Sequence, residues 1–267
     1  MEMETAIVLA ANSPIIIKLF GPTAEYLGDN LKNWTEKSHE NTRKIISSAI
    51  KKVENLDDGK QVPPRALKNI LTEGSYCEDP LATEYFGGVL ASSRSINGRD
   101  DRGVVWSSLL GQLSTYQLRT HYIIYQAMIN TFHGKDYTFN MEDRPKMSIL
   151  IPSSAYHSAM EFSDEELKQV IQILTQTFFG LYKEGLIEKF YYGPNVELQK
   201  KVKIEKLPFT ESGIYITPSA LGVELFLWVH GFGQFNIGDT LFLDFPELNG
   251  APPMPISFSE QELKDNT

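Results

Sequence analysis

Residues 163–229 decide the fold, and they read SDEELKQVIQILTQTFFGLYKEGLIEKFYYGPNVELQKKVKIEKLPFTESGIYITPSALGVELFLWV. Ser163 and the three acidic residues after it form a capping-box signature, which is typical of a helix start. Apolar residues, among them Ile171, Phe178 and Tyr182, then recur at steps of three and four until Gly185, a glycine suited to a left-handed helix stop. The pattern predicts one amphipathic helix over 163–185.

The second part of this stretch contains turn residues between extended runs, a pattern that predicts strands. Two extended runs flank the turn Gly193-Pro194-Asn195, and a short strand is predicted at 214–216. Thr217-Pro218 combines an N-cap residue with proline at the first helical position, so a last helix is expected to follow. A helix, a two-stranded wing, a strand and a helix in this order are typical of a winged-helix module.

The composition indicates a globular chain with an acidic balance of charge. The 267 residues are 42% hydrophobic and 11% aromatic, which is enough for packed cores, and the formal net charge is −9. Bulk binding to phosphate backbones depends on lysine and arginine, so this charge disfavours a general nucleic-acid binder. The single cysteine, Cys77, excludes an internal disulfide and fits a cytoplasmic protein.

These patterns predict a mainly α protein with a small β component, divided into a helical N-terminal half and a winged-helix-like C-terminal half. The polar, turn-rich segment 134–146 marks the boundary, and a strand is expected at 147–152. We therefore place a helical domain at 1–140, a winged-helix-like domain at 147–245 and a proline-rich, acidic tail at 246–267. A further strand is expected at 240–243, and the tail is expected to lie along the surface and end in a short helix or frayed.

Two short apolar runs near the N-terminus, 6–11 and 15–20, are separated by Asn12-Ser13-Pro14. A secretory signal needs positive charge before its apolar run, and a spanning helix needs about 20 uninterrupted apolar residues. Neither condition is met. The runs are predicted to pack on the core, and the alternative is an arm over 6–20 that contacts a membrane or a partner.

The N-terminal half is predicted to be all-helical. A long helix is expected over 23–56, although Ser38 and Asn41 interrupt its apolar stripe. It is interpreted as a core helix, and the alternative is a coiled-coil seam through which two copies dimerise. Pro63-Pro64 opens the next helix, and a third runs from about 78 to 92. Gly87-Gly88 in its middle costs on the order of 2 kcal/mol relative to two alanines, which suggests that another helix approaches closely.

Short patterns in both halves resemble the Abi-alpha family. They comprise Gly21-Pro22-Thr23-Ala24-Glu25-Tyr26-Leu27-Gly28-Asp29, Val62-Pro63, the helix at 66–71, Leu90-Ala91-Ser92, Gly185-Leu186-Ile187, and Thr217-Pro218 with Leu221-Gly222. The resemblance spans residues 20–230 and departs where the family's pattern has tryptophan, since this chain has Tyr85 and Phe86. It implies a bacterial protein of abortive infection, the response in which an infected cell stops growing before phage is released, and it assigns no catalytic residue.

The polar loop 93–102 interleaves arginines with aspartates. Its candidate partner- or anion-binding residues are Arg94, Asn97, Arg99, Asp100, Asp101 and Arg102. Adjacent opposite charges usually satisfy one another, so a salt-bridged loop is the first interpretation. The alternative is a site where the planar guanidinium of arginine clamps a carboxylate or phosphate of a partner. In that case, replacing the three arginines with alanine abolishes activity and leaves the melting curve intact.

The predicted helix over 163–185 is unsuited to a DNA major groove, because its acidic residues outnumber its lysines. The predicted wing is more basic, and its candidate nucleic-acid contacts are Lys189, Lys200, Lys201, Lys203 and Lys206. Acidic neighbours partly offset these lysines, and charge pairs across two strands explain them equally well. We therefore favour a protein-binding or structural winged helix over a DNA-binding one.

No arrangement typical of catalysis or metal binding stands out in the sequence. The five histidines lack paired metal spacing, and His121, in a helix predicted at 114–132, is interpreted as a packing residue. We therefore predict a non-enzyme without cofactor or metal. The leading hypothesis is a cytoplasmic anti-phage protein that acts through a protein partner, phage-derived in the simplest case, or through a membrane, with a homo-oligomer as a further option. The alternative is a winged-helix transcription regulator that binds DNA through its basic wing.

Overall fold

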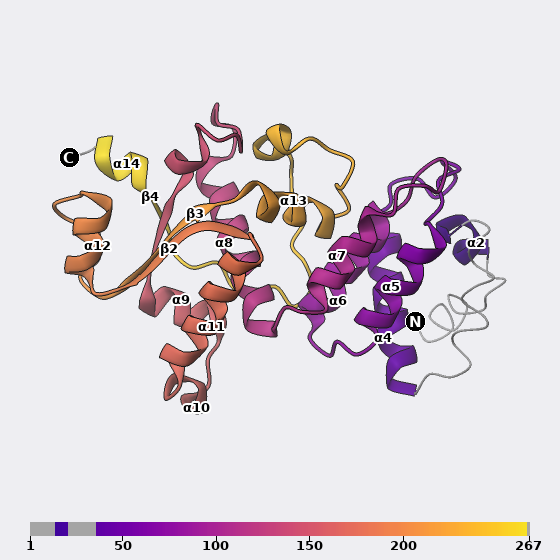
Figure 1. Ribbon diagram of the computed structural model, residues 1–267, viewed down its shortest axis with the longest axis horizontal. Coiled ribbons are helices and arrows are strands. Elements are labelled where there is room, and N and C mark those ends of the chain that lie inside the picture. Colours follow the sequence, from indigo (N-terminus) through magenta and orange to yellow (C-terminus); the bar gives the residue numbers. More distant parts are fainter. Residues whose placement is uncertain (1–13, 21–35, 266–267) are drawn as a thin grey trace. The chain divides into compact units, whose positions relative to one another are not determined.

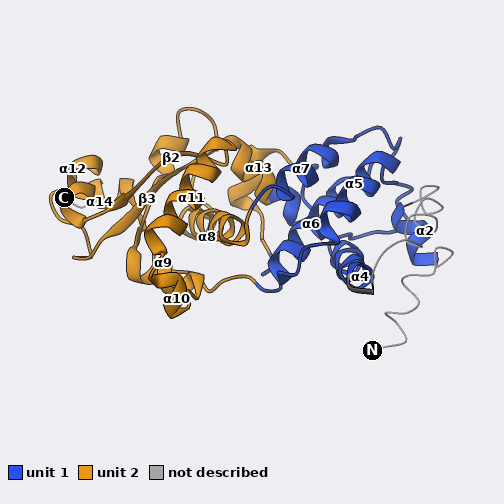
Figure 2. Ribbon diagram, turned by 60° about the horizontal axis from the view of Figure 1, so that its bottom comes forward, with its two compact units in different colours: residues 1–113, 227–234, 246–250 blue, residues 114–226, 235–245, 251–267 orange. Residues whose placement is uncertain are grey.

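The computed structural model describes residues 14–20 and 36–265 (Figure 1). The protein is mainly helical (56%) and carries a four-stranded antiparallel sheet in its C-terminal part, which confirms the mainly α class with a small β component. The chain forms two compact units, drawn in different colours in Figure 2. Unit 1 contains 1–113, 227–234 and 246–250, and unit 2 contains 114–226, 235–245 and 251–267.

The unit boundaries differ from the predicted domain boundaries. The predicted boundary between 140 and 147 lies inside unit 2, because helix α8 (Thr115–Phe132) packs against helix α11 (Val170–Lys183) and belongs with the sheet. The predicted tail at 246–267 is divided, since 246–250 belong to unit 1 and the rest to unit 2. Chain order and spatial grouping therefore diverge in the last forty or so residues.

Unit 1 is built around helix α6 (Pro80–Ser92), whose side chains are nearly all buried. The Asp79 carboxylate caps its first turn by accepting from the Ala82 amide at 3.1 Å. Helix α2 (Pro14–Phe20) buries Ile16, Leu19 and Phe20, which confirms core packing for the described part of the N-terminal runs. The helices that pack on α6 are α4 (Glu36–Lys51), α5 (Pro64–Gly74) and α7 (Arg102–Leu110).

The predicted helix over 23–56 ends earlier than expected. Helix α4 stops at Lys51, and residues 21–35, which include the Gly21 to Asp29 pattern, lie outside the described residues, as do 1–13. Ser38 and Asn41 do not interrupt the helix, because both are buried and the Asn41 amide donates to the Ser75 carbonyl oxygen at 2.9 Å. A buried polar group that has a partner costs little, so the apolar stripe accommodates it.

Two glycines in α6 permit the close approach that their position suggested. A Cβ atom at Gly87 would lie 2.4 Å from the Ser48 hydroxyl oxygen of α4. A Cβ atom at Gly88 would lie 1.8 Å from the backbone carbonyl oxygen of Val229. The α6 backbone therefore packs directly against two other segments of unit 1, and no residue larger than glycine fits at these two positions.

Unit 2 contains the sheet and the helices that cover it. The strands predicted at 147–152 and 214–216 are confirmed as β1 and β3. Helix α13 (Ala220–Val229) crosses the unit boundary after Phe226. The remaining elements are η2 (Arg144–Met147), β1 (Ile149–Pro152), α9 (Ser153–Met160), α10 (Asp164–Leu167), β2 (Ile187–Gly193), α12 (Asn195–Val202), β3 (Gly213–Pro218), η3 (Ile237–Phe242), β4 (Phe258–Ser259) and α14 (Glu260–Asp265).

The sheet has the strand order β2-β3-β1-β4, with antiparallel neighbours throughout. Tyr191 pairs with Tyr215, which pairs in turn with Leu150, so these three side chains form one row on one face. The next row, on the opposite face, contains Phe190, Ile216 and Ile149. Apolar side chains therefore lie on both faces of the sheet, and each face needs other elements of the chain packed against it to exclude water.

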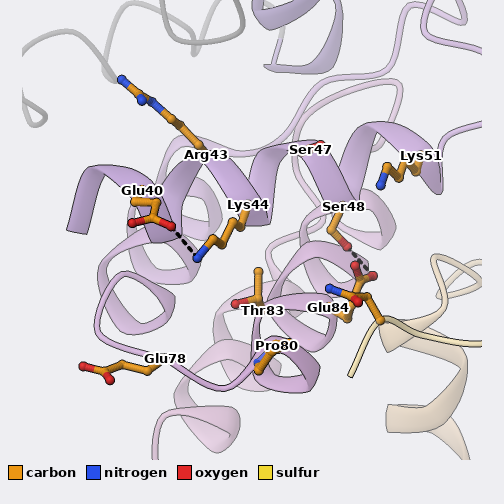
Figure 3. Close-up of a pocket in the computed structure, with 11 residues that line it drawn as sticks. Glu40, Arg43, Lys44, Ser47, Ser48, Lys51, Glu78, Pro80, Thr83 and Glu84 are labelled. Carbon is orange, nitrogen blue, oxygen red and sulfur yellow. Dashed lines mark hydrogen bonds and ion pairs between the residues drawn. The ribbon is translucent and has the colours of Figure 1, made fainter. Parts of the chain in front are cut away.

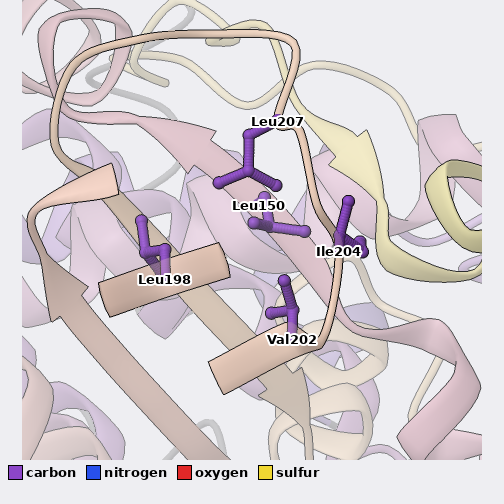
Figure 4. Packing of buried hydrophobic residues seen from close by; sticks show 5 residues of the cluster. All are labelled: Leu150, Leu198, Val202, Ile204 and Leu207. Carbon is purple, nitrogen blue, oxygen red and sulfur yellow. The ribbon is translucent and has the colours of Figure 1, made fainter. Parts of the chain in front are cut away.

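The predicted two-stranded wing is wrong. Only the run before Gly193-Pro194-Asn195 is a strand, β2, and the run after it is helix α12. Leu198 and Val202, one helical turn apart, are buried in a cluster with Leu150, Ile204 and Leu207 (Figure 4). A helix places residues four positions apart on one side, so α12 covers the sheet face that carries Leu150.

The predicted helix over 163–185 is two helices. Its capping box is confirmed, since the Ser163 hydroxyl accepts from the Glu166 amide at 3.3 Å. Helix α10 nevertheless ends at Leu167, where the Gln169 amide bonds to the Glu166 carbonyl oxygen three residues back and breaks the regular pattern. The stop at Gly185 is confirmed by its φ of +70° and by the 2.8 Å bond from the Leu186 amide to the Leu181 carbonyl oxygen.

Three smaller expectations are corrected. Thr217 and Pro218 belong to β3, and α13 is capped instead by Ser219, whose hydroxyl accepts from the Gly222 amide at 2.9 Å. The strand predicted at 240–243 is the 3-10 helix η3. The tail does not simply lie along the surface, because β4 pairs with β1 and buries Ser259; the expected short terminal helix is α14.

Candidate functional site

An apolar surface on unit 2 is formed by one side of α11 and the adjoining strand β2. We call it the α11 face and define it by Ile171, Phe179, Tyr182 and Phe190. The first three side chains are 62%, 56% and 53% exposed and recur at helical spacing, whereas Phe190 is half-buried. Single exposed apolar residues are ordinary on proteins, whereas a contiguous apolar patch of about 300–600 Å² is often functional.

Aromatic contacts hold the α11 face together. The Phe190 ring lies 5.0 Å from the Phe179 ring in an edge-on arrangement, and the buried Phe178 ring stacks on Phe190 at 5.7 Å. Beside them, the hydroxyl oxygens of Thr175 and Tyr192 are 2.8 Å apart and share a hydrogen bond. Helix and strand therefore present these side chains as one surface with defined geometry.

The two ends of the α11 face differ in charge. Asp164 and Glu165 are exposed in the first turn of α10, whereas Lys183 is exposed in the last turn of α11. Glu166 is engaged, because the Tyr116 hydroxyl donates to its carboxylate at 2.5 Å, and this bond is the largest cause of the lowered pKa of Glu166. The chain is therefore acidic before the N-terminal end of the α11 face and basic at its C-terminal end.

The five lysines predicted as nucleic-acid contacts lie on a strand, a helix and a loop instead of a two-stranded wing. Lys200 pairs with Glu197 at 2.8 Å, and the Lys201 ammonium lies 5.7 Å from the centre of the Tyr191 ring. Helix α12 and the loop after it bring four of the five into one short segment. In chain order, the five positions are Lys189 on β2, Lys200 and Lys201 on α12, Lys203 at its left-handed C-cap and Lys206 in the following loop.

Arg94 is separated from the rest of the predicted anion-binding loop. Its side chain is 3% exposed, bonds to the Asp58 carboxylate at 2.7 Å and donates to the carbonyl oxygens of Leu19 and Asn55 at 3.3 and 3.5 Å. Burial raises the pKa of Asp58, but bonds from the Lys60 amide and from Arg94 outweigh it, so the pKa is lowered overall. These contacts favour the salt-bridged interpretation, in which Arg94 joins α2 to the loop after α4.

From 95 to 102 the loop is half-exposed or exposed, and it largely engages its own neighbours. Arg102 bonds to the Asp100 carboxylate through two nitrogens at 2.9 and 2.7 Å, and this contact is the main cause of the lowered pKa of Asp100. Asp101 pairs with Arg65 of α5 at 3.2 Å. The Asn97 side chain accepts from the Arg99 amide at 3.1 Å, and Arg99 itself is exposed.

A polar cavity of about 470 Å³ opens between α4 and the N-terminal end of α6 (Figure 3). Beside it, the Lys52 ammonium pairs with the Glu84 carboxylate and donates to the Ser48 hydroxyl at 2.6 Å, and that hydroxyl donates to Glu84 at 2.7 Å. Burial lowers the pKa of Lys52 against the attraction of Glu84. Sequence reasoning missed this network, although the spacing of four residues between Ser48 and Lys52 places the two side chains together on a helix.

Within 14–20 and 36–265, no group of three or more His, Cys, Asp or Glu side chains is arranged to hold a metal ion. The His121 ring packs 4.7 Å from the Tyr125 ring and bonds to the Gly222 carbonyl oxygen at 3.0 Å, which confirms the packing role. Burial raises the pKa of the Cys77 thiol to about 11, so the thiol stays protonated at neutral pH. None of the described helices has the length and apolar character needed to cross a membrane.

No protein-family model matches the chain, and no curated protein and no solved structure matches it. Its function therefore has to be inferred from these surfaces.

Proposed function

We propose that this chain is a non-enzymatic protein that acts by binding another protein through the α11 face. The observation that carries the proposal is the exposure of Ile171, Phe179 and Tyr182 on a helix whose adjoining side packs into the core. Covering one such side chain in an interface stabilises the complex by about 1.5–3 kcal/mol. Aromatic residues are also enriched at the centres of protein interfaces, where they carry much of the binding energy.

The connectivity of unit 2 supports a winged-helix-like module. Apart from η2 and the four-residue α10, its elements up to β3 follow the order α8, β1, α9, α11, β2, α12 and β3, and the strand order β2-β3-β1 puts the last of these strands between the other two. In this interpretation α11 takes the position of the recognition helix and α12 the position of the wing. A recognition helix that has an apolar face and is preceded by acidic residues suits a protein surface better than a DNA groove.

The resemblance to the Abi-alpha family supports a role in abortive infection. We place the protein in the bacterial cytoplasm, where contact with a protein partner couples phage infection to growth arrest. Contact with a membrane through residues 6–20 is the weaker route, because the described part of that arm turns Ile16, Leu19 and Phe20 into unit 1.

The test is a phage panel on a bacterial host that expresses the wild type, Phe179→Glu or Val196→Glu at matched levels. Val196 is a matched control, because it is 59% exposed in unit 2 but lies on α12, outside the α11 face. We expect the wild type to reduce plaques with early death of infected cells, Phe179→Glu to lose both effects and Val196→Glu to keep both. Normal plaque formation on cells that contain folded wild-type protein would refute the role in defence.

A second candidate, a winged-helix transcription regulator, is favoured by one observation. Lys203 and Lys206 are exposed and have no acidic partner among the described residues, and they follow Lys200 and Lys201 at the position of the wing. Binding to duplex DNA that falls steeply with salt and is lost in Lys203→Glu/Lys206→Glu would favour this candidate.

A further inference from the structure

We infer that the α11 face binds the α11 face of a second copy of this chain, with the two α11 helices antiparallel. This inference rests on the proposed protein-binding role of the face and names its partner. A two-fold dimer uses the same patch on both copies, so the patch must be complementary to itself. Three properties of the α11 face meet that requirement: its spacing, its area and its charge.

The spacing of the stripe suits antiparallel pairing. Ile171 and Tyr182 stand at its two ends, about 16 Å apart along the helix axis, and Thr175 and Phe179 lie between them. When two such helices pack antiparallel, Ile171 meets Tyr182 of the other copy and Thr175 meets Phe179. Each ring then faces a smaller side chain, which allows the two surfaces to interdigitate.

The area suits a dimer that forms at moderate concentration. The four side chains of the α11 face expose on the order of 400 Å² per copy, so pairing buries about 800 Å² of apolar surface from both copies. Gln172 and Gln176 are exposed beside the stripe and supply a polar rim. With this rim, the total approaches the roughly 1,200–2,000 Å² of stable interfaces.

The charge selects the antiparallel orientation. At the basic end, Lys183 pairs with Glu184 at 2.9 Å, but the Lys183 side chain is 79% exposed and the Glu184 side chain only 25%, so the ammonium can also bind a carboxylate of another copy. At the acidic end, Lys168 is bound to Glu165 at 2.5 Å, so Asp164 supplies the unbalanced charge. Antiparallel packing brings the acidic end of each copy to Lys183 of the other copy, and it also opposes the helix dipoles. Parallel packing would place like charges together.

The first experiment measures the mass of the full chain by sedimentation equilibrium over a wide range of concentration. We expect dimers for the wild type and for the control Val196→Glu. Phe179→Glu buries a carboxylate on each side of the interface, so we expect its dimer to be at least about 100-fold weaker. Circular dichroism confirms that each variant is folded. A wild type that stays monomeric, or a folded Phe179→Glu that dimerises as well as the wild type, overturns the inference.

A charge exchange tests the orientation. Lys183→Glu and Asp164→Lys each replace two attractions per dimer with repulsions, so we expect each to weaken the dimer by about 10-fold. The double variant restores both attractions and regains wild-type affinity if the helices are antiparallel. A double variant that stays as weak as the singles overturns the antiparallel arrangement.

The phage assay separates this inference from the proposed function. If the wild type is monomeric and Phe179→Glu still loses protection, the face binds a different protein: the proposed function stands and the dimer is refuted. If the wild type is dimeric and the monomeric Phe179→Glu still protects, the dimer stands and the proposed function is refuted.

Discussion

Arg94 and Arg99 show, at the scale of single residues, that surroundings decide what a charge does. Both lie in the same polar loop, yet the Arg94 guanidinium is enclosed by the Asp58 carboxylate and by backbone carbonyl oxygens, whereas the Arg99 side chain is exposed. A charge taken out of water is tolerated only when partners surround it. The sequence alone placed the two arginines in one candidate site, because the partners of Arg94 come from 18–19 and 55–60.

Arg94→Ala is expected to lower the free energy of unfolding by about 3 kcal/mol, because it removes a buried guanidinium that bonds to the Asp58 carboxylate and to backbone carbonyl oxygens. Arg99→Ala, the matched control in the same loop, is expected to change it by less than about 0.5 kcal/mol. Urea unfolding followed by circular dichroism measures both. This expectation reverses the one drawn from the sequence, and equal midpoints for Arg94→Ala and the wild type would restore Arg94 as a ligand candidate.

At the scale of elements, the glycines of α6 make a prediction about how closely segments pack. Gly88→Ala is expected to destabilise the protein by about 3 kcal/mol or more, because the new Cβ atom meets the Val229 backbone, which has no rotamer to change. The gain of about 1 kcal/mol in helix propensity does not offset this cost. Thermal unfolding measures the effect.

Gly180→Ala in α11 is the control for that substitution. Its Cβ atom would also meet a close neighbour, but the neighbour is the end of the Gln117 side chain, which can turn away. We therefore expect Gly180→Ala to stay within about 1 kcal/mol of the wild type. A Gly88→Ala variant as stable as Gly180→Ala would contradict the close packing at Val229.

Local signals predicted the elements that local chemistry determines. The capping box at Ser163, the glycine stop at Gly185 and the strand β3 needed only neighbouring residues. Helix α12 was missed because Leu198 and Val202 are too few to distinguish a helix from a strand, and only the sheet face beneath them decides. The exposure of the α11 face was hidden for a related reason: Ile171 and Tyr182 fit the same apolar stripe as buried Phe178, and periodicity does not say how much of a stripe is covered.

At the scale of the whole molecule, the two units are assembled from segments far apart in the chain. The Ser92 hydroxyl donates to the Trp228 carbonyl oxygen at 2.9 Å, and a Cβ atom at Gly250 would lie 2.7 Å from the Pro80 side chain, so 227–234 and 246–250 return to unit 1. Apolar periodicity and capping patterns predicted the mainly helical class correctly. They carry no information about which distant segments join a unit, because an apolar face specifies burial and not which segment buries it.

Acid stability is a property of the whole molecule, because titrating groups in both units act on it in the same direction. Burial lowers the pKa of His157 below 6.5, although Glu211 opposes the shift. The unfolded chain then binds a proton at higher pH than the folded chain, so stability decreases as pH falls from about 6.5 towards the folded pKa. The lowered pKa values of Asp58, Asp100 and Glu166 add a second loss, which begins below their usual values near 4 and proceeds as pH falls through the folded values.

We therefore expect the melting temperature to fall in two steps between pH 8 and pH 2.5, a small one below about 6.5 and a larger one below about 4. His157→Asn is neutral at every pH and should remove the first step alone, because the buried Nε2 of His157 has no hydrogen-bond partner among the described residues and titration is its main contribution. Asp58→Asn should reduce the second step and lower the melting temperature at pH 7, since Arg94 loses its counter-charge. Differential scanning calorimetry across this range measures both. A wild-type melting temperature that is constant from pH 7 to pH 5 would contradict the desolvated environment of His157. A second step of unchanged size in Asp58→Asn would show that the Asp58–Arg94 pair does not contribute to acid unfolding.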